Sequence, residues 1–323
     1  MRKDLIIKIL KTFVIAALFI SCSEEIITPE KKFSFEKLSG SVQGVTSVCI
    51  NGEGTVAAWS GISNDVRVKD SERLVGHIGS VNSVKLNKSG SLLISGSADH
   101  NIKIWDVRTG VLLRTFSEHI TNTRCVIFTP DEKSVVSAEG DYLVYWINGV
   151  SGFIGKLPMY GHTGTVTSVA MTKDMKKIIS ASFDKTIKIW NAETGELIHS
   201  IDAHEETIRE VKINPVLNQF ASCSDDSTIK IWDLASYNLL KVLRKDMGEI
   251  KSISYHYTGN YIAEGGDNHK INIWDLNSDS VVLSLEEHEG TINSIMFSPE
   301  ADDLISGDSR DKVIIWRNVF SKN

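Results

Sequence analysis

Six tryptophans recur at nearly constant spacing along the chain and constrain its fold more than any other feature. They fall at positions 105, 146, 190, 232, 274 and 316, so the intervals are 41, 44, 42, 42 and 42 residues. Most of them end a short segment in which isoleucine alternates with polar residues, such as TIKIW at 186–190. This alternation is typical of β-strands. A period of this length indicates repeated supersecondary units that stack against one another.

Each repeat has room for four strands. A histidine precedes the tryptophan by 28 residues in four units, at His77, His162, His204 and His288, and by 27 residues in a fifth, at His119. Three strands separated by short turns fit between histidine and tryptophan, and a fourth leads to the next unit.

A seventh, altered unit precedes these six. Gly40–Val48 matches Gly76–Val84 with an offset of 36 residues, which places Ser41 at the histidine position and Lys69 at the tryptophan position. The remaining tryptophan of the chain, Trp59, falls on the second strand of this unit. We expect its indole to fill the volume that the missing indole leaves.

The motifs resemble the signature of the WD-repeat family, with Gly-His at 76–77 and 161–162 and Trp-Asp at 105–106, 232–233 and 274–275. The resemblance covers residues 33–318. It implies an all-β fold, a seven-bladed β-propeller of four-stranded antiparallel blades. Only seven residues follow Trp316, whereas FSFEKL at 33–38 precedes the first unit. An open ring would expose an unpaired strand edge, so we predict that the N-terminal strand completes the last blade.

The resemblance also implies a structural tetrad inside each blade, in which buried imidazole and indole N–H groups find hydrogen-bond partners. The expected sets are His77, Ser95, Asp99 and Trp105; His119, Ser137, Asp141 and Trp146; His162, Ser180, Asp184 and Trp190; His204, Ser222, Asp226 and Trp232; and His288, Ser306 and Trp316, with Asp311 displaced by one position. Unit six has Asp246, Glu264 and Asn268 at the polar positions. We therefore expect blades six and one to be the most loosely held.

The same residue types occur in Ser-His-Asp catalytic triads. A triad works as one asymmetric set beside a cleft, whereas this trio recurs around a ring, so we interpret it as structural. We found no histidine or cysteine at metal-ligand spacing and no glycine-rich loop that opens a helix, and we expect no metal and no cofactor. Cys49, Cys125 and Cys223 fall on predicted strands and are interpreted as core thiols, with a redox role as the alternative.

The first 22 residues differ from the repeats. A basic stretch at 1–11 precedes an apolar run at 13–20 and then Ser21-Cys22, a pattern typical of a secretory signal peptide. The run is too short for a bilayer span. Ser21-Cys22 resembles the lipobox of bacterial lipoproteins, in which the cysteine is acylated and becomes the new amino terminus. An ordinary cleaved signal peptide is the alternative.

This second resemblance sets the expected domain organisation and location. We expect a signal peptide at 1–21, a tether over 22–31 that is lipidated at Cys22, and the propeller over 32–323. The acyl chains alone would hold the protein in the bacterial cell envelope. We expect the outer rather than the inner membrane, with the propeller periplasmic or surface-exposed.

Composition and loop length indicate the class of function. A formal net charge of −6 argues against nucleic-acid binding, because phosphate neutralisation needs a basic surface. Short loops offer a broad rim rather than a lidded cavity, which favours binding over catalysis. The family resemblance implies a non-catalytic, monomeric scaffold that binds other proteins on the face with the histidine loops.

The residues expected on that partner-binding face are Asn82, Arg124, Thr167, Phe183, Arg209, Lys251, Asn293 and Arg310. Four of them are cationic, so we expect an acidic partner; a solvated ring of charges explains them equally well. Two other functions stay open. A ligand-binding or envelope assembly-factor propeller is not distinguished from a scaffold by sequence, and a propeller hydrolase would need an unrepeated cluster at the axis, of which the sequence shows none.

Overall fold

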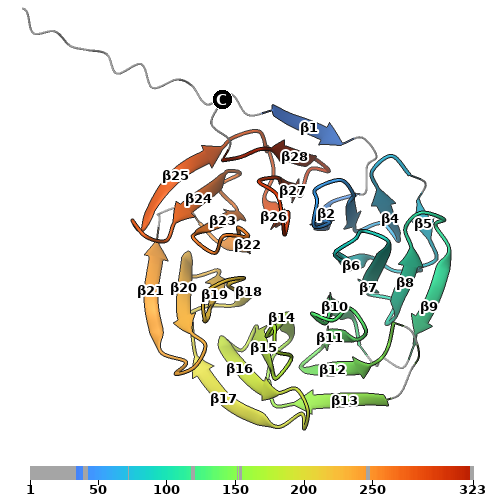
Figure 1. Cartoon of the computed structure of the whole chain (residues 1–323), viewed down its shortest axis with the longest axis horizontal. Helices are drawn as coiled ribbons and strands as arrows, with labels where there is room; N and C mark the ends of the chain where they lie inside the picture. Colours follow the sequence, from blue (N-terminus) through green and yellow to red (C-terminus); the bar gives the residue numbers. More distant parts are fainter. Residues whose placement is uncertain are drawn as a thin grey trace, which may run out of the picture. The chain divides into compact units, whose positions relative to one another are not determined.

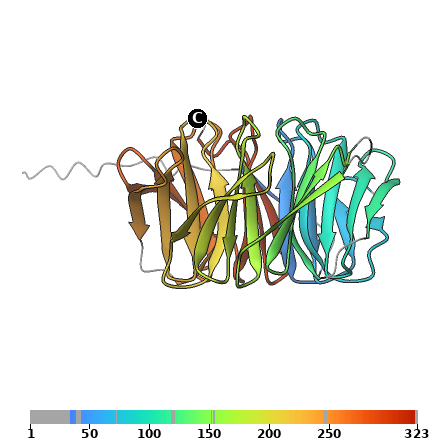
Figure 2. The same cartoon turned by 90° about the horizontal axis from the view of Figure 1, so that it is seen from below.

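The computed structural model describes residues 34–38, 43–71, 73–117, 121–150, 152, 155–244 and 248–320. Within these residues, 28 strands form seven four-stranded antiparallel sheets, and no helix is present. The sheets stand as blades around a central axis (Figure 1), and in the side view the strands run along that axis (Figure 2). The predicted all-β, seven-bladed propeller is confirmed.

The blades follow one another in chain order, each from an inner to an outer strand. Blade 1 contains β2 (Val45–Ile50), β3 (Ala57–Gly61), β4 (Asp65–Val68) and β5 (Leu74–Val75). Blade 2 contains β6 (Val81–Leu86), β7 (Leu92–Ser97), β8 (Ile102–Asp106) and β9 (Leu112–Phe116). Blade 3 contains β10 (Thr123–Phe128), β11 (Val135–Glu139), β12 (Tyr142–Ile147) and β13 (Gly155–Tyr160). Blade 4 contains β14 (Val166–Met171), β15 (Lys177–Ser182), β16 (Thr186–Asn191) and β17 (Leu197–Asp202).

The remaining blades repeat this arrangement. Blade 5 contains β18 (Ile208–Ile213), β19 (Gln219–Ser224), β20 (Thr228–Asp233) and β21 (Leu239–Arg244). Blade 6 contains β22 (Ile250–Tyr255), β23 (Tyr261–Gly266), β24 (Ile271–Asp275) and β25 (Ser280–Leu285). Blade 7 contains β26 (Ile292–Phe297), β27 (Leu304–Asp308), β28 (Val313–Arg317) and the N-terminal strand β1 (Ser34–Leu38).

The hydrophobic core lies between neighbouring blades. Val136 and Ala138 of blade 3 share one buried cluster with Val166, Ile178 and Trp190 of blade 4. Neighbouring blades cover both faces of each sheet, so a strand such as β15 is buried on both faces, whereas an outer strand such as β17 is mostly exposed. Because successive blades pack in the same way, a tryptophan can recur once per unit.

Blade 1 is shortened at its outer edge. Its outer hairpin pairs Val66 with Leu74, eight residues apart, where blade 2 pairs Ile102 with Phe116, fourteen residues apart. The 36-residue offset therefore removes residues from the outer hairpin and leaves the inner strands intact. Trp59 lies in the core between blades 7 and 1, as Trp105 lies between blades 1 and 2. That its indole fills the volume of the missing one stays a prediction.

The N-terminal strand completes the ring. β1 pairs antiparallel with β28 from Ser34 opposite Arg317 to Leu38 opposite Val313. The Phe35 ring packs on Trp316, with 5.6 Å between ring centroids. The closure predicted from sequence is confirmed. Cys22, the signal peptide at 1–21 and the tether at 22–31 lie outside the described residues, as do His119 and Asp246.

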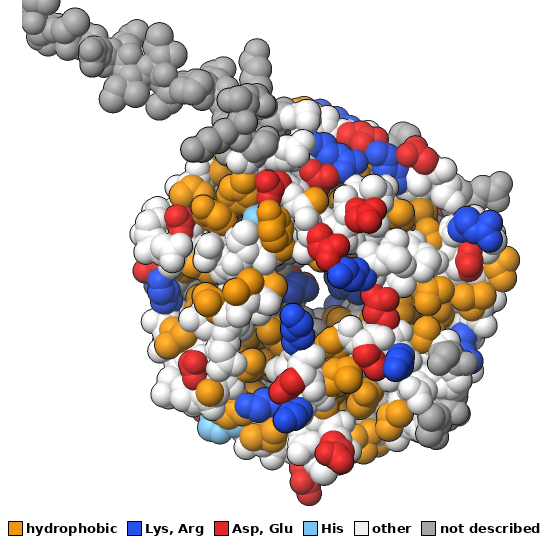
Figure 3. Space-filling model, viewed as in Figure 1, with side chains coloured by type: hydrophobic (Ala, Val, Ile, Leu, Met, Phe, Trp, Pro, Cys, Tyr) orange, Lys and Arg blue, Asp and Glu red, His pale blue; other side chains and the backbone are white. Residues whose placement is uncertain are grey.

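The inner strands leave a channel at the axis. It is a cavity of ≈ 120 Å³ lined by side chains from the inner strands of all seven blades. In the space-filling view, Lys and Arg side chains gather around its opening (Figure 3). In the part of the chain that the structure describes, no helix has the length and apolar character needed to cross a membrane.

Candidate functional site: the hub and its cationic sector

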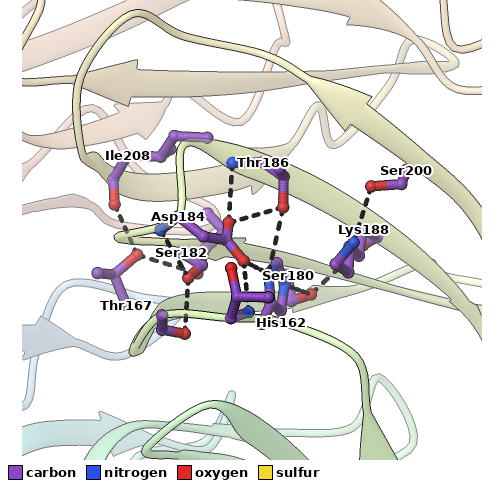
Figure 4. A network of polar contacts seen from close by, with 12 residues as sticks. His162, Thr167, Ser180, Ser182, Asp184, Thr186, Lys188, Ser200 and Ile208 are labelled. Carbon is purple, nitrogen blue, oxygen red and sulfur yellow. Dashed lines mark hydrogen bonds and ion pairs between the residues drawn. The ribbon is translucent and has the colours of Figure 1, made fainter.

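Four blades contain the same chain of buried hydrogen bonds. In blade 4, Trp190 Nε1 donates to Ser180 Oγ at 2.8 Å. Ser180 Oγ lies 2.8 Å from His162 Nε2, and His162 Nδ1 lies 2.8 Å from Asp184 Oδ2 (Figure 4). An indole only donates and a carboxylate only accepts, so the serine hydroxyl donates to Nε2 and the imidazole donates from Nδ1. This series of hydrogen bonds runs from the core outwards to the turn.

Blades 2 and 5 repeat this chain with the same partners. The carboxylates of Asp99 and Asp226 lie 2.8 Å from Nδ1 of His77 and His204. Burial acts to raise the pKa of Asp226, but hydrogen bonds from His204 and Thr228 outweigh it and hold this pKa well below its usual range. Burial lowers the pKa of His204, and Asp226 opposes this only in part. The pair is therefore a neutral imidazole on an ionised carboxylate.

The geometry explains why these sets hold the blades and take part in no chemistry. The Ser95, Ser180, Ser222 and Ser306 side chains are completely buried, and each hydroxyl is held between an indole and an imidazole. A hydroxyl in this position cannot reach a substrate. The glycine before the histidine has a packing reason, since a Cβ on Gly76 would lie 3.0 Å from Trp105 Cη2.

Two of the expected carboxylates are wrong. In blade 7 the acid is Asp308, whose Oδ2 lies 2.8 Å from His288 Nδ1, whereas Asp311 accepts a hydrogen bond from the Gly44 backbone N–H. In blade 3, Ser137 Oγ donates to Glu139 at 2.7 Å, and Asp141 is exposed. Both acids lie two residues after the serine, on the second strand itself. Asp308 therefore bonds the histidine from the strand rather than from the turn, whereas Glu139 bonds the serine.

Blade 6 has a different polar core. Glu264 accepts a hydrogen bond from Asn272 Nδ2 at 3.0 Å. Trp274 Nε1 is buried and has no hydrogen-bond partner among the described residues. This blade therefore lacks the bond that ties the indole to the second strand in blades 2, 3, 4, 5 and 7.

A second polar system joins the blades at the hub. Each inner strand contains a β-bulge between its first and third residues, which turns neighbouring side chains towards the next blade. The third residue accepts a hydrogen bond from the backbone N–H of the fourth residue in the following blade. The acceptors in six blades are Ser47, Ser83, Ser168, Glu210, Ser252 and Ser294, and Cys125 stands at this position in blade 3. These contacts are arranged around the axis.

The second residue of the inner strand adds another contact in four blades. Asn82 donates to the Thr123 carbonyl at 3.0 Å, Thr167 donates to the Ile208 carbonyl at 2.7 Å, and Asn293 donates to the Val45 carbonyl at 2.8 Å. Thr46 makes the equivalent bond in blade 1. The side chains of Asn82, Thr167 and Asn293 are therefore used between blades, and their role on a partner-binding face stays a prediction.

The other three blades carry cations at this position and make no such bond among the described residues. Arg124 and Arg209 each place the guanidinium carbon 5.5 Å from the centroid of the Phe183 ring, which is 36% exposed. This distance is within the range of cation–π attraction. We call Arg124, Phe183, Arg209 and Lys251 the cationic sector. It spans blades 3 to 6 at the mouth of the channel.

One carboxylate, Asp225, pairs with two cations of this sector. Asp225 accepts two hydrogen bonds from Arg209, at 2.8 and 2.5 Å, and lies 3.2 Å from Lys251 Nζ. Burial acts to raise the pKa of Asp225, but the Arg209 guanidinium outweighs it and lowers this pKa. Lys251 also pairs with Glu249. Arg310, expected in the same cluster, makes its ion pair with Glu289 at 4.0 Å in blade 7.

Comparison with known proteins agrees with this geometry. The family description "WD domain, G-beta repeat" matches residues 69–106, 154–191, 195–233 and 279–317. Each matched segment ends on the third strand of a blade, at or just after its tryptophan. The chain carries WD40 repeats.

Relatives with WD40 repeats match parts of the chain. The WD repeat domain-containing protein 83 homolog of Dictyostelium discoideum is 32% identical over 129 residues, which is 40% of this chain and 39% of the relative. Eukaryotic translation initiation factor 3 subunit I of Phaeosphaeria nodorum is 30% identical over 186 residues, 52% of this chain and 55% of the relative. Autophagy-related protein 16 of Arabidopsis thaliana is 27% identical over 130 residues, 40% of this chain and 25% of the relative. The chain therefore covers less than two thirds of each of these relatives.

Sequence reasoning missed the ring of interblade bonds, although the WD40 repeats contain a signal for it. The third residue of the inner strand is serine in five of seven blades, as in VTSV at 45–48 and 166–169. Its recurrence next to an apolar pair indicates a structural role, as the recurrence of the tetrads does. In the described part of the chain, no group of three or more His, Cys, Asp or Glu side chains is placed to hold a metal ion.

Proposed function

We propose that this WD40 propeller is a non-catalytic scaffold that binds an acidic protein partner through the cationic sector. The observation that carries the proposal is the type of residue at the second position of each inner strand. Four blades use this position to bond the next blade, whereas blades 3, 5 and 6 carry Arg124, Arg209 and Lys251 there. Arg209 and Lys251 share Asp225, so part of this charge joins blades 5 and 6. Arg124 is exposed and has no carboxylate partner among the described residues, which favours a binding role over a solvated ring of charges.

The chemistry of the sector suits carboxylate groups on a folded partner. Arg124 has no carboxylate partner among the described residues, and its guanidinium can take a carboxylate in bidentate geometry. Phe183 adds an exposed apolar surface between the two arginines, the combination found at interaction hot spots. Asp225 holds Arg209 in a fixed orientation, which reduces the entropy that ordering the side chain would cost on binding.

The relatives support a role inside protein assemblies. One of them is a subunit of translation initiation factor 3, and another, from Schizosaccharomyces pombe, is the target of rapamycin complex subunit wat1. These matches cover only part of each relative, so the partner of this chain is a matter for experiment. The proposal also includes lipid anchoring at Cys22 in the bacterial envelope, which rests on the basic, apolar and Ser-Cys pattern of residues 1–22.

Crosslinking in intact cells, followed by capture and identification of partners, tests the scaffold. The test variant combines Arg124→Glu with Arg209→Glu, and the matched control reverses two exposed arginines elsewhere, Arg108→Glu with Arg244→Glu. Capture should fall strongly in the test variant and persist in the control. Phe183→Ser, which leaves the charge unchanged, should also weaken capture. Undiminished capture by a folded double-reversal variant refutes the proposal. Loss of acyl labelling in Cys22→Ser tests the anchor separately.

A further inference from the structure

We propose that the channel at the hub of the propeller binds a small oxyanion, with Lys85 as the principal cation. The proposed site lies in the same channel as the cationic sector but deeper, and the proposal does not depend on the scaffold function. The cavity of ≈ 120 Å³ is lined by 18 residues of the seven inner strands, and five of those residues are cationic against one carboxylate. A single water needs roughly 10–15 Å³ of such space, so the channel has room for a compact anion of a few heavy atoms.

The site lies deeper than the cationic sector. Lys85 and Lys212 are the fifth residues of β6 and β18, three positions beyond the residues at the mouth. At about 3.3 Å per residue, this places them about 10 Å further along the channel. An anion held here is enclosed by the inner strands rather than spread on the rim.

Lys85 is the feature that needs a partner. Lys212 Nζ pairs with Glu210 Oε1 at 2.5 Å, and Glu210 Oε2 accepts hydrogen bonds from Ser252 Oγ and the Ile253 N–H, both at 2.8 Å. Glu210, the one carboxylate among the described residues that line the channel, is thus already paired. The Lys85 side chain has no ion pair and no hydrogen bond among the described residues, although it lines the same cavity.

The surroundings of Lys85 leave its charge uncompensated. Burial lowers the pKa of Lys85, the nearby Lys212 ammonium lowers it further, and Glu210 opposes both. Two thiols lie close to Lys85, but burial raises the pKa of Cys49 to about 12 and also raises that of Cys125, so neither supplies a counter-charge near neutral pH. A bound oxyanion would stabilise the Lys85 ammonium directly.

The channel also offers neutral donors. Ser47, Ser83 and Ser294 accept backbone N–H bonds from the next blade through Oγ, and their own hydroxyl protons have no acceptor among the described residues. These hydroxyls can donate to an oxyanion held by Lys85. Phosphate and a small carboxylate share this chemistry, and the experiment separates them.

The test uses the purified propeller with its natural inner strands. Inorganic phosphate and acetate are titrated separately by calorimetry and by thermal unfolding, against sodium chloride at matched ionic strength. The variant Lys85→Met removes the ammonium and retains the length of the side chain. Lys133→Met, on an exposed turn, is the control, and Lys85→Arg retains the charge. Because Lys85 has no partner to lose, Lys85→Met should fold as stably as the parent protein without an anion.

We expect at least one of the two anions to bind the parent protein and Lys133→Met and to raise their unfolding temperature. Lys85→Met should bind it at least about tenfold more weakly, as expected for loss of a charged hydrogen bond, and Lys85→Arg should retain binding. Preference for phosphate or for acetate identifies the class of oxyanion. Absence of binding beyond the chloride control, or equal affinity in a folded Lys85→Met, overturns the proposal.

Discussion

Two tryptophans at the same strand position differ in one hydrogen bond, and substituting both measures what the tetrads contribute. Trp190 and Trp274 are 1% and 5% exposed. Trp190 Nε1 donates to Ser180, whereas Trp274 Nε1 has no partner in the part of the chain that the structure describes. Substitution by phenylalanine removes a similar buried volume at both sites, so this cost largely cancels in the comparison. Trp190→Phe also breaks a buried hydrogen bond, worth about 1–3 kcal/mol when the acceptor is left unsatisfied.

Trp274→Phe removes a buried donor that has nothing to bond, so the loss of this N–H carries no penalty. We therefore expect Trp190→Phe to lower the free energy of unfolding by about 1–3 kcal/mol more than Trp274→Phe does. Urea unfolding followed by far-ultraviolet circular dichroism is the appropriate assay, because the substitutions themselves alter indole fluorescence. Trp232→Phe, which loses the bond to Ser222, should resemble Trp190→Phe. Equal destabilisation by all three would refute the assigned role of the tetrads.

Three further predictions concern the ring as a whole. The pKa values of His204 and Asp226 are below their ordinary 6.5 and 3.8, so the unfolded chain binds more protons and the urea midpoint should fall as pH decreases from 6.5 through 3.8; a midpoint that rises on acidification contradicts this. Ser83→Ala leaves the buried Val126 N–H without its acceptor and should cost about 1–3 kcal/mol in urea unfolding, whereas a cost near zero would remove the hub bonds from the account. Cysteines introduced at Ser34 and Arg317, which face each other across β1 and β28, should form a disulfide on mild oxidation, seen by electrophoretic mobility, and failure to form it would contradict closure by β1.

The fold follows from the sequence because the repeat makes the same prediction many times. A single TIKIW segment predicts a strand, but its recurrence every 42 residues predicts the number of blades and the place of each strand. The shorter length of the first unit was also predictable from the sequence, because an offset of 36 residues in place of 42 indicates missing residues. The offset alone does not locate the deletion. The pairing of Val66 with Leu74 places it in the outer hairpin, where a shortened strand exposes little of the core.

The site was less predictable, because a side chain can reach the same partner from two backbone positions. Asp308 replaces the turn aspartate from two residues after the serine, and Glu139 stands at the same place in blade 3, where other blades have Ser97, Ser182 or Ser224. An acid at this place in the repeat was a visible signal, but alignment by turn position pointed to Asp311 and Asp141 instead.

At the hub, residues at equivalent sequence positions make different contacts. Asn82 and Arg124 occupy equivalent positions and look equally suited to binding a partner in the sequence. Only the structure shows that Asn82 bonds the Thr123 carbonyl of the next blade and that Arg124 packs against Phe183. Such contacts depend on the β-bulge and on the spacing between blades, and neither is encoded in one strand alone.

The central claim is that a partner binds the cationic sector, and a hydrogen-exchange footprint of the captured partner on the propeller tests it most directly. The turns at 183–185 and 225–227 carry Phe183 and Asp225 of this face, whereas the turns at 173–176 and 215–218 join the opposite ends of the same blades. The account predicts slower amide exchange at 183–185 and 225–227 when the partner is bound, with 173–176 and 215–218 unchanged. Protection confined to 173–176 and 215–218, or to the outer strands, would contradict it.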